Sequence, residues 1–177
     1  MTTTPSPIAI GDRLADIELI APDGTTSSLR TALGGTSAVV HFMRSSSCPV
    51  CLAHIAMMQR MKDAGELGDA VIVVVAPGAQ PEAEDAAARV SRRAPGASTW
   101  SSPDGHAALG MARGALLQHS GTFVVDAASV VRAVTLSANP LQGFSPSATR
   151  AALAEIAQAP VRSRGAGSGS SSYTLKR

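Results

Sequence analysis

Two cysteines stand three positions apart in the sequence Cys48-Pro49-Val50-Cys51, and the chain has no others. A thiol attacks as its thiolate, which calls for a pKa below the usual value of ~8.5. In the first turn of a helix, cysteines at this spacing have Cα atoms ~5–6 Å apart, so they can close and reopen a disulfide. The pair therefore predicts thiol redox chemistry.

The elements around the motif favour this chemistry. A strand is predicted over residues 37–43, and a helix with apolar positions at helical spacing is predicted from the cysteines to Gly65. The free N–H groups and the positive dipole end of a helix start lower the pKa of a thiol there. Pro49 costs no hydrogen bond in the first turn, which leaves Cys48 more exposed than Cys51. Local geometry thus predicts Cys48 as the nucleophile.

Two other interpretations of the motif stay open. The cysteines could be small core residues, or they could form half of a zinc site. A structural zinc site normally has four ligands, and the sequence has no second CxxC motif and no paired histidines, with only His54 close by. We therefore predict no metal and no cofactor.

Charged side chains could assist a thiolate. Arg44 lies between the predicted strand and the predicted helix, where its charge could stabilise a thiolate. Arg132 alternates with valines inside a predicted strand, where a charge is costly unless it is paired, so it is a second candidate partner. Arg13 is expected at the surface. The four histidines share no spacing, and His41, in the strand that faces the motif, is the one kept as a candidate.

Further elements follow along the chain. Strands are predicted over 17–21, 25–29, 70–76, 122–125 and 130–136, and helices over 81–93, 104–111 and 145–159. The strand-helix-strand order predicts a parallel crossover, and the late hairpin adds antiparallel strands. The expected fold class is α/β: a central mixed sheet with helices on both faces, compatible with the thioredoxin fold. The predicted domain covers 11–159, between a flexible leader over 1–10 and a disordered Gly/Ser-rich tail over 160–177.

Composition excludes several classes. A net charge of +2 and five aromatic residues offer neither a basic stripe nor stacking platforms, so no nucleic-acid partner is expected. The longest apolar run, 71–76, is far below the ~20 residues that span a bilayer, so no membrane partner is expected. The first ten residues do not resemble a secretory signal, which predicts a cytoplasmic protein whose thiols are kept reduced.

Several motifs together resemble the alkyl hydroperoxide reductase/thiol-specific antioxidant family, the peroxiredoxin-like branch of the thioredoxin superfamily. They are Gly11-Asp12-x-x-Ala15-Asp16, the Cys-Pro-x-Cys motif, Ser102-Pro103-Asp104-Gly105, Gly121-Thr122-Phe123-Val124-Val125-Asp126 and Val130-Val131-Arg132. The resemblance implies a thioredoxin-like fold, a hydroperoxide substrate, a thiol reductant and a possible homodimer. It also implies an active-site arginine in the strand that contains Arg132.

The chain departs from the family at two positions. Peroxiredoxins typically have Pro-x-x-x-Thr-x-x-Cys around the peroxidatic cysteine, and here Arg44 replaces the proline and Cys48 replaces the threonine. This register assigns the peroxidatic position to Cys51, whereas local geometry favours Cys48. Sequence alone leaves both assignments open.

The leading hypothesis is a thiol redox protein whose cysteine pair reduces hydroperoxides or exchanges protein disulfides. A thioredoxin-type or low-molecular-weight thiol would then reopen the disulfide. One alternative is a copper or other metal carrier with the same fold, to which His119 could contribute. Another is a non-catalytic module that binds a partner.

Overall fold

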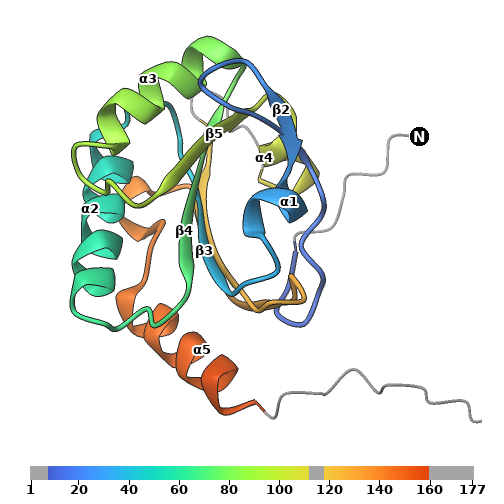
Figure 1. Cartoon of the computed structure of the whole chain (residues 1–177), viewed down its shortest axis with the longest axis vertical. Helices are drawn as coiled ribbons and strands as arrows, with labels where there is room; N and C mark the ends of the chain where they lie inside the picture. Colours follow the sequence, from blue (N-terminus) through green and yellow to red (C-terminus); the bar gives the residue numbers. More distant parts are fainter. Residues whose placement is uncertain (1–7, 112–117, 160–177) are drawn as a thin grey trace, which may run out of the picture.

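The computed structural model describes residues 8–111 and 118–159. The predicted tail over 160–177 and most of the predicted leader lie outside the described residues. Seven strands form one sheet in the order β2-β1-β5-β4-β3-β6-β7 (Figure 1). They are β1 (Glu18–Ile20), β2 (Thr26–Ser28), β3 (Ala38–Phe42), β4 (Val71–Pro77), β5 (Ser98–Ser102), β6 (Ser120–Val125) and β7 (Val131–Ser137).

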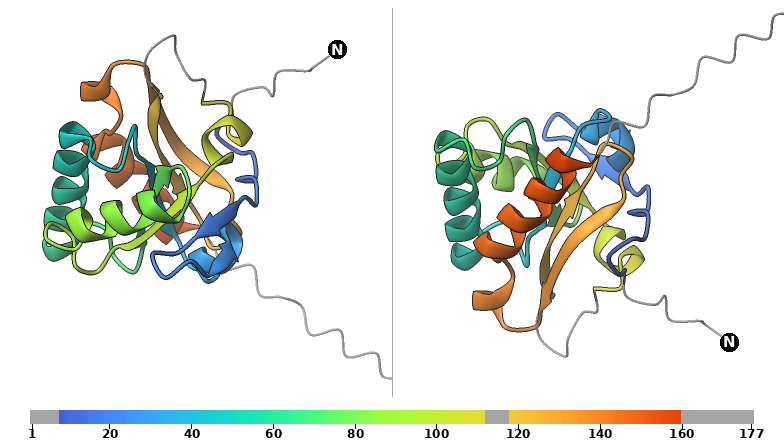
Figure 2. Two further views of the ribbon diagram at one scale, coloured as in Figure 1. Left: turned by 90° about the horizontal axis from the view of Figure 1, so that it is seen from above. Right: turned by 90° about the horizontal axis from the view of Figure 1, so that it is seen from below.

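Helices cover both faces of this sheet, as Figures 1 and 2 show. The helices are α1 (Leu29–Leu33), α2 (Pro49–Asp63), α3 (Gln80–Val90), α4 (Gly105–Ala108) and α5 (Pro146–Gln158), with a 3₁₀ turn η1 (Pro140–Gln142). Helices α2, α3 and α5 pack on one face, and α1 and α4 pack on the other. The predicted α/β class with a mixed sheet is confirmed. Within the described residues, no helix is both long enough and apolar enough to cross a membrane.

The register of the sheet determines which residues share an end of it. Strands β3, β4 and β5 are parallel, and β6 pairs with β3 in the antiparallel direction. At the carboxyl end of β3, Phe42 pairs with Val75 on one side and Gly121 on the other. At the opposite end Ala38 pairs with Val125. The cysteine motif follows β3 directly, so it lies at the end of the sheet where β6 begins.

Successive residues of β3 pack into two separate cores. Val39, together with Met43 directly after the strand, faces the core under α2, α3 and α5, whereas Val40 and Phe42 face the core under α1 and α4. All four are fully buried. Burial on both faces explains why apolar residues occupy successive positions of this strand instead of alternating with polar ones, with His41 as the one polar exception. The strand therefore forms a rigid base beneath the cysteine motif.

Helix α1, strand β5 and the 3₁₀ turn η1 were not predicted from the sequence. The strand expected over 25–29 ends at Ser28, because the Ser28 hydroxyl accepts a hydrogen bond from the Thr31 N–H and caps α1. Strand β5 has the sequence Ser-Thr-Trp-Ser-Ser, which lacks apolar alternation. Its buried serines are satisfied by donating to backbone carbonyls instead, Ser101 to Ala79 at 2.6 Å and Ser102 to Glu18 at 2.7 Å.

Candidate active site

Cys48 is the N-cap residue of α2. Its Sγ accepts a hydrogen bond from the Cys51 N–H at 3.4 Å, and its carbonyl accepts the Leu52 N–H at 3.0 Å. Pro49 occupies the first helical position, where it has no hydrogen bond to lose. The predicted placement of Cys48 at a helix start is confirmed, and its sulfur replaces the side-chain oxygen that usually caps a helix.

Both cysteines carry free thiols, and Cys51 is the more deeply buried. Cys48 retains 7% of its accessible surface, against 1% for Cys51. The Cys51 Sγ lies under the loop before α2 and accepts a hydrogen bond from the Arg44 N–H at 3.4 Å. A reagent from solvent therefore reaches Cys48 first.

The two thiols have opposite electrostatic properties. A hydrogen bond from the Cys51 thiol is the largest of the effects that lower the pKa of Cys48 from 9.0 to about 6. The N–H groups of Cys51 and Val50 and the charge of Arg44 act in the same direction. The same side-chain hydrogen bond, followed by burial, raises the pKa of Cys51. Near neutral pH the site therefore holds a thiolate at Cys48 beside a protonated thiol at Cys51.

Arg44 lies beside the cysteine pair and is itself buried, with 8% of its surface exposed. Its guanidinium donates a hydrogen bond to the Ala138 carbonyl at 2.9 Å. This contact connects the loop before α2 to the segment that follows β7. Arg44 thus contributes to the site in two ways, through its backbone N–H on Cys51 and through its charge near Cys48.

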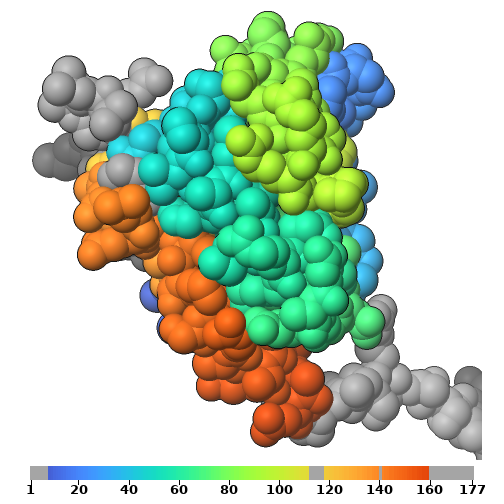
Figure 3. Space-filling view, turned by 90° about the vertical axis from the view of Figure 1, so that its left-hand side faces the viewer, coloured from blue at the N-terminus to red at the C-terminus, as the bar shows by residue number. Residues whose placement is uncertain are grey.

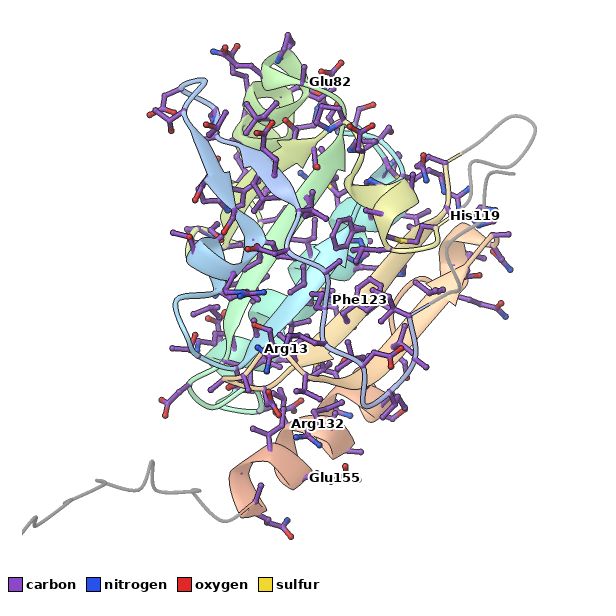
Figure 4. All side chains as sticks on the ribbon, turned by 90° about the vertical axis from the view of Figure 1, so that its right-hand side faces the viewer. Arg13, Glu82, His119, Phe123, Arg132 and Glu155 are labelled. Atoms are coloured by element: carbon purple, nitrogen blue, oxygen red, sulfur yellow. The ribbon has the colours of Figure 1, made fainter. Side chains whose placement is uncertain are left out.

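Arg132 lies elsewhere in the fold. It pairs with Asp126, with its Nη2 2.5 Å from the carboxylate, and its side chain is 43% exposed. Its neighbour Val131 pairs with Val125, which places it at the end of the sheet remote from the cysteine motif. Figure 4 shows Arg132 beside the exposed Arg13 at that end, and His119 at the other. The sequence-based placement of Arg132 at the thiols is wrong, because an edge strand lets a charge reach solvent and an ion pair.

A set of polar residues lies beneath α2, and of these only His41 was kept as a candidate from the sequence. His41 is fully buried, and its Nδ1 lies 2.9 Å from the Thr122 Oγ1. Burial is the main reason that the pKa of His41 falls to about 3. His54 packs its ring edge-on against His41, with centroids 5.8 Å apart. The sequence pattern that could have predicted the placement of His54 is its spacing of three positions from Cys51 on one helix, which puts both side chains on the same face.

Helix α2 lies on the surface between α3 and the segment 139–158, as the space-filling view shows (Figure 3). Its first turn, which contains the cysteines, is therefore bordered by protein on both sides. Within residues 8–111 and 118–159, no group of three or more Cys, His, Asp or Glu side chains could hold a metal ion. The copper-carrier alternative receives no supporting observation.

A comparison with known protein families identifies the family of the chain. A family model described as Redoxin matches residues 9–153, most of the chain. The chain belongs to the Redoxin family. A comparison with curated protein sequences finds no match for this redoxin.

Solved structures similar to this redoxin include several peroxiredoxins. Peroxidoxin BcpB from Mycobacterium tuberculosis is 22% identical, with a TM-score of 0.65 over 83% of this chain and 97% of that chain. A thiol peroxidase from Chromobacterium violaceum is 18% identical, with a TM-score of 0.73 over 86% and 90%. AhpC from Mycobacterium tuberculosis is 20% identical, with a TM-score of 0.62 over 89% and 98%. The redoxin therefore has the thioredoxin-like fold of the peroxiredoxins.

Proposed function

We propose that this redoxin is a thiol-dependent oxidoreductase in which the Cys48 thiolate attacks the oxidant and Cys51 closes an intramolecular disulfide. The observation that carries the proposal is the asymmetry of the pair. The Cys51 thiol and N–H both hydrogen bond to the Cys48 sulfur at the start of α2, so the pKa falls at Cys48 and rises at Cys51. A nucleophile and a resolving thiol need these properties.

With a hydroperoxide, the Cys48 thiolate attacks one peroxide oxygen and the O–O bond breaks. The products are Cys48 sulfenic acid and an alkoxide or hydroxide, which takes up a proton. The Cys51 sulfur then attacks the Cys48 sulfur, and the S–O bond breaks to release water. With a protein disulfide, Cys48 forms a mixed disulfide and Cys51 displaces the second thiolate. Both routes oxidise the pair by two electrons, and neither requires a cofactor.

The family register, which aligns Cys51 with the peroxidatic cysteine, leads to the opposite assignment. Cys51 is nearly inaccessible, and its sulfur is already engaged by the Arg44 N–H and by Cys48. These contacts favour Cys48 as the attacking residue. In the family pattern, a threonine that assists the peroxide stands at the position that Cys48, the proposed nucleophile, occupies here. We therefore keep the disulfide of a second protein as a substrate class beside hydroperoxides.

The catalytic cycle closes when an external thiol reduces the Cys48–Cys51 disulfide. The proposed donor is a thioredoxin-type protein or a low-molecular-weight thiol, because either can attack a disulfide whose leaving thiol has a low pKa. We place this cycle in the cytoplasm, where such donors keep thiols reduced. A homodimer is the proposed assembly, on the family resemblance alone.

Stopped-flow kinetics test this proposal. The reduced protein is mixed with hydrogen peroxide and, separately, with an oxidised thioredoxin-like protein, and the Cys48→Ser and Cys51→Ser variants are compared with the wild type. Cys48→Ser should abolish the first step. Cys51→Ser should react once and accumulate a sulfenic acid or a mixed disulfide. Full turnover by Cys48→Ser would refute the assignment, and reaction of the wild type with neither oxidant would refute the function.

A further inference from the structure

A buried hydrogen-bonded chain lies between α2 and the sheet, next to the cysteine pair. His41 on β3 contacts the Thr122 hydroxyl, with Nδ1 and Oγ1 2.9 Å apart, and that hydroxyl donates to the Gly143 carbonyl at 2.7 Å. A hydroxyl has one proton to donate, so Thr122 must accept from the Nδ1–H of His41. The tautomer of His41 follows: its Nε2 carries a lone pair and no hydrogen.

Three atoms at this place are buried without a hydrogen-bond partner. They are the His41 Nε2, the His54 Nδ1 and the Ser120 Oγ. The Leu141 carbonyl raises the pKa of His54, as expected if the other ring nitrogen donates to that carbonyl. The Nδ1 of His54 is then also a bare lone pair. Buried acceptors without a donor are costly, so a pair of them is an unusual arrangement for a core.

Gly143 leaves room for these atoms to be neighbours. A Cβ at this position would lie 2.7 Å from the Ser120 Oγ and 3.7 Å from the His54 Cε1, the ring carbon bonded to Nδ1. The rings of His41 and His54 are perpendicular, with centroids 5.8 Å apart. None of these three atoms hydrogen bonds to another, so the His54 Nδ1 keeps a free lone pair in its buried position.

Cys51 is a source of a proton in the proposed reaction. Cys51 and His54 are three residues apart in α2, so their side chains emerge on the same face of the helix, with Cβ atoms ~5–6 Å apart. A thiol must lose its proton to attack, and burial and the contact with Cys48 make Cys51 a poor acid. Formation of the disulfide therefore requires a base on the Cys51 side of the pair.

We propose that His54 accepts the proton of Cys51 on its free Nδ1 as the disulfide closes. This inference rests on the proposed function. In the step, the Cys51 S–H bond breaks toward His54, the S–S bond forms, and the Cys48 S–O bond breaks. The leaving hydroxide is protonated to water, and the proton held by His54 returns to solvent.

The surroundings allow His54 to act as this base at neutral pH. Burial lowers its pKa from the usual 6.5, so the ring is neutral and can accept a proton. His41, whose pKa is about 3, is a far weaker base, so the proton stays on His54. Besides Cys51, the titratable groups around His54 are His41 on β3 and, farther away, Arg44 beside Cys51 and His106, whose charge acts on His41. Ser120, Thr122 and Phe144 face it without charge.

The test separates the two chemical steps in the full chain. One equivalent of hydrogen peroxide oxidises Cys48, and disulfide closure is followed by mass spectrometry of quenched samples. In His54→Gln the first step should stay within about twofold of the wild type, and closure should slow by about 10²-fold or more, the usual contribution of a general base. His119→Gln, a histidine outside the cluster, is the matched control and should close at the wild-type rate.

A second measurement needs no variant, in case His54→Gln does not fold. In the wild type, closure should be independent of pH near neutrality and should slow only when the pH falls far enough below 6.5 to reach the lowered pKa of His54, because only neutral His54 accepts the proton. Closure that is as fast in His54→Gln as in the wild type, or a wild-type rate that rises about tenfold per pH unit well into the alkaline range, would overturn the inference. Absence of closure in the wild type with any oxidant would instead overturn the proposed function.

Discussion

Replacing Cys51 by alanine tests the electrostatic asymmetry of the pair directly. The substitution removes the thiol donor that most lowers the pKa of Cys48. It leaves in place the N–H groups at the helix start and the charge of Arg44. We therefore expect the pKa of Cys48 to rise from about 6 but to remain below 9.0.

The size of the effect follows from the fraction of thiolate. At pH 6 a thiol with a pKa of about 6 is half ionised. A rise of about one unit leaves about a tenth ionised, so the rate of Cys48 alkylation at pH 6 should fall about fivefold. At alkaline pH, where both proteins are fully ionised, the two rates should converge. The wild type should be the faster protein at acid pH, because a lower pKa keeps Cys48 ionised to lower pH.

The assay is the pH dependence of iodoacetamide alkylation, with thiolate absorbance in the ultraviolet as an independent readout. Cys51→Ser is the matched control, since its hydroxyl can still donate a hydrogen bond to the Cys48 thiolate. The pKa of Cys48 in Cys51→Ser should lie between its values in the wild type and in Cys51→Ala. If Cys48 titrates identically in the wild type and Cys51→Ala, the reasoning is refuted and the helix start alone must account for the low pKa.

Three further predictions concern the surrounding charges. Arg132→Ala should leave the pKa of Cys48 unchanged and its alkylation rate within about twofold of the wild type. It should cost at most about 1 kcal/mol of unfolding free energy, because the Arg132 side chain is largely exposed. A large loss of thiol reactivity would contradict the placement of Arg132. Arg44→Met should raise the pKa of Cys48 by less than Cys51→Ala does, because the charge is the smallest of the effects that lower it; the alkylation profile checks this. Stability in urea should decrease as the pH falls below 6.5, since buried His41 and His106 have pKa values of about 3 and about 4 and unfolding lets them bind protons. Each of these two histidines should lower the free energy of unfolding by about 1.4 kcal/mol per pH unit while only the unfolded form is protonated. An unfolding free energy that stays constant from pH 6.5 to 5 would contradict this.

Much of the fold could be predicted from the sequence because its local signals are strong. The apolar runs of β3 and β4 and the start of α2 at the cysteine motif all appear where the pattern indicates them. Strand β5 could not be predicted, because its serines are satisfied by carbonyls that come from distant parts of the chain. Hydrogen bonds of that kind depend on tertiary structure and leave no periodic pattern.

The site was predictable only in part for the same reason. Spacing and the helix start indicated Cys48 and Cys51 as candidates, and Arg44 became a candidate by its position beside them. Arg132 was misplaced because alternation within a strand does not show whether the strand lies at an edge of the sheet. The partnership of His41 with Thr122 joins residues 81 positions apart, so only the pairing of β3 with β6 reveals it.

The hydrogen bond from the Arg44 N–H to the Cys51 sulfur links the two positions at which the chain departs from the peroxiredoxin pattern. A proline at position 44 has no N–H to donate, so a chain with the usual proline could not hold the Cys51 sulfur in this way. The Cys51 thiol that is held there is in turn the donor to Cys48, which replaces the usual threonine. The two replacements therefore depend on each other, and in descent we expect them to have been gained together and to be lost together.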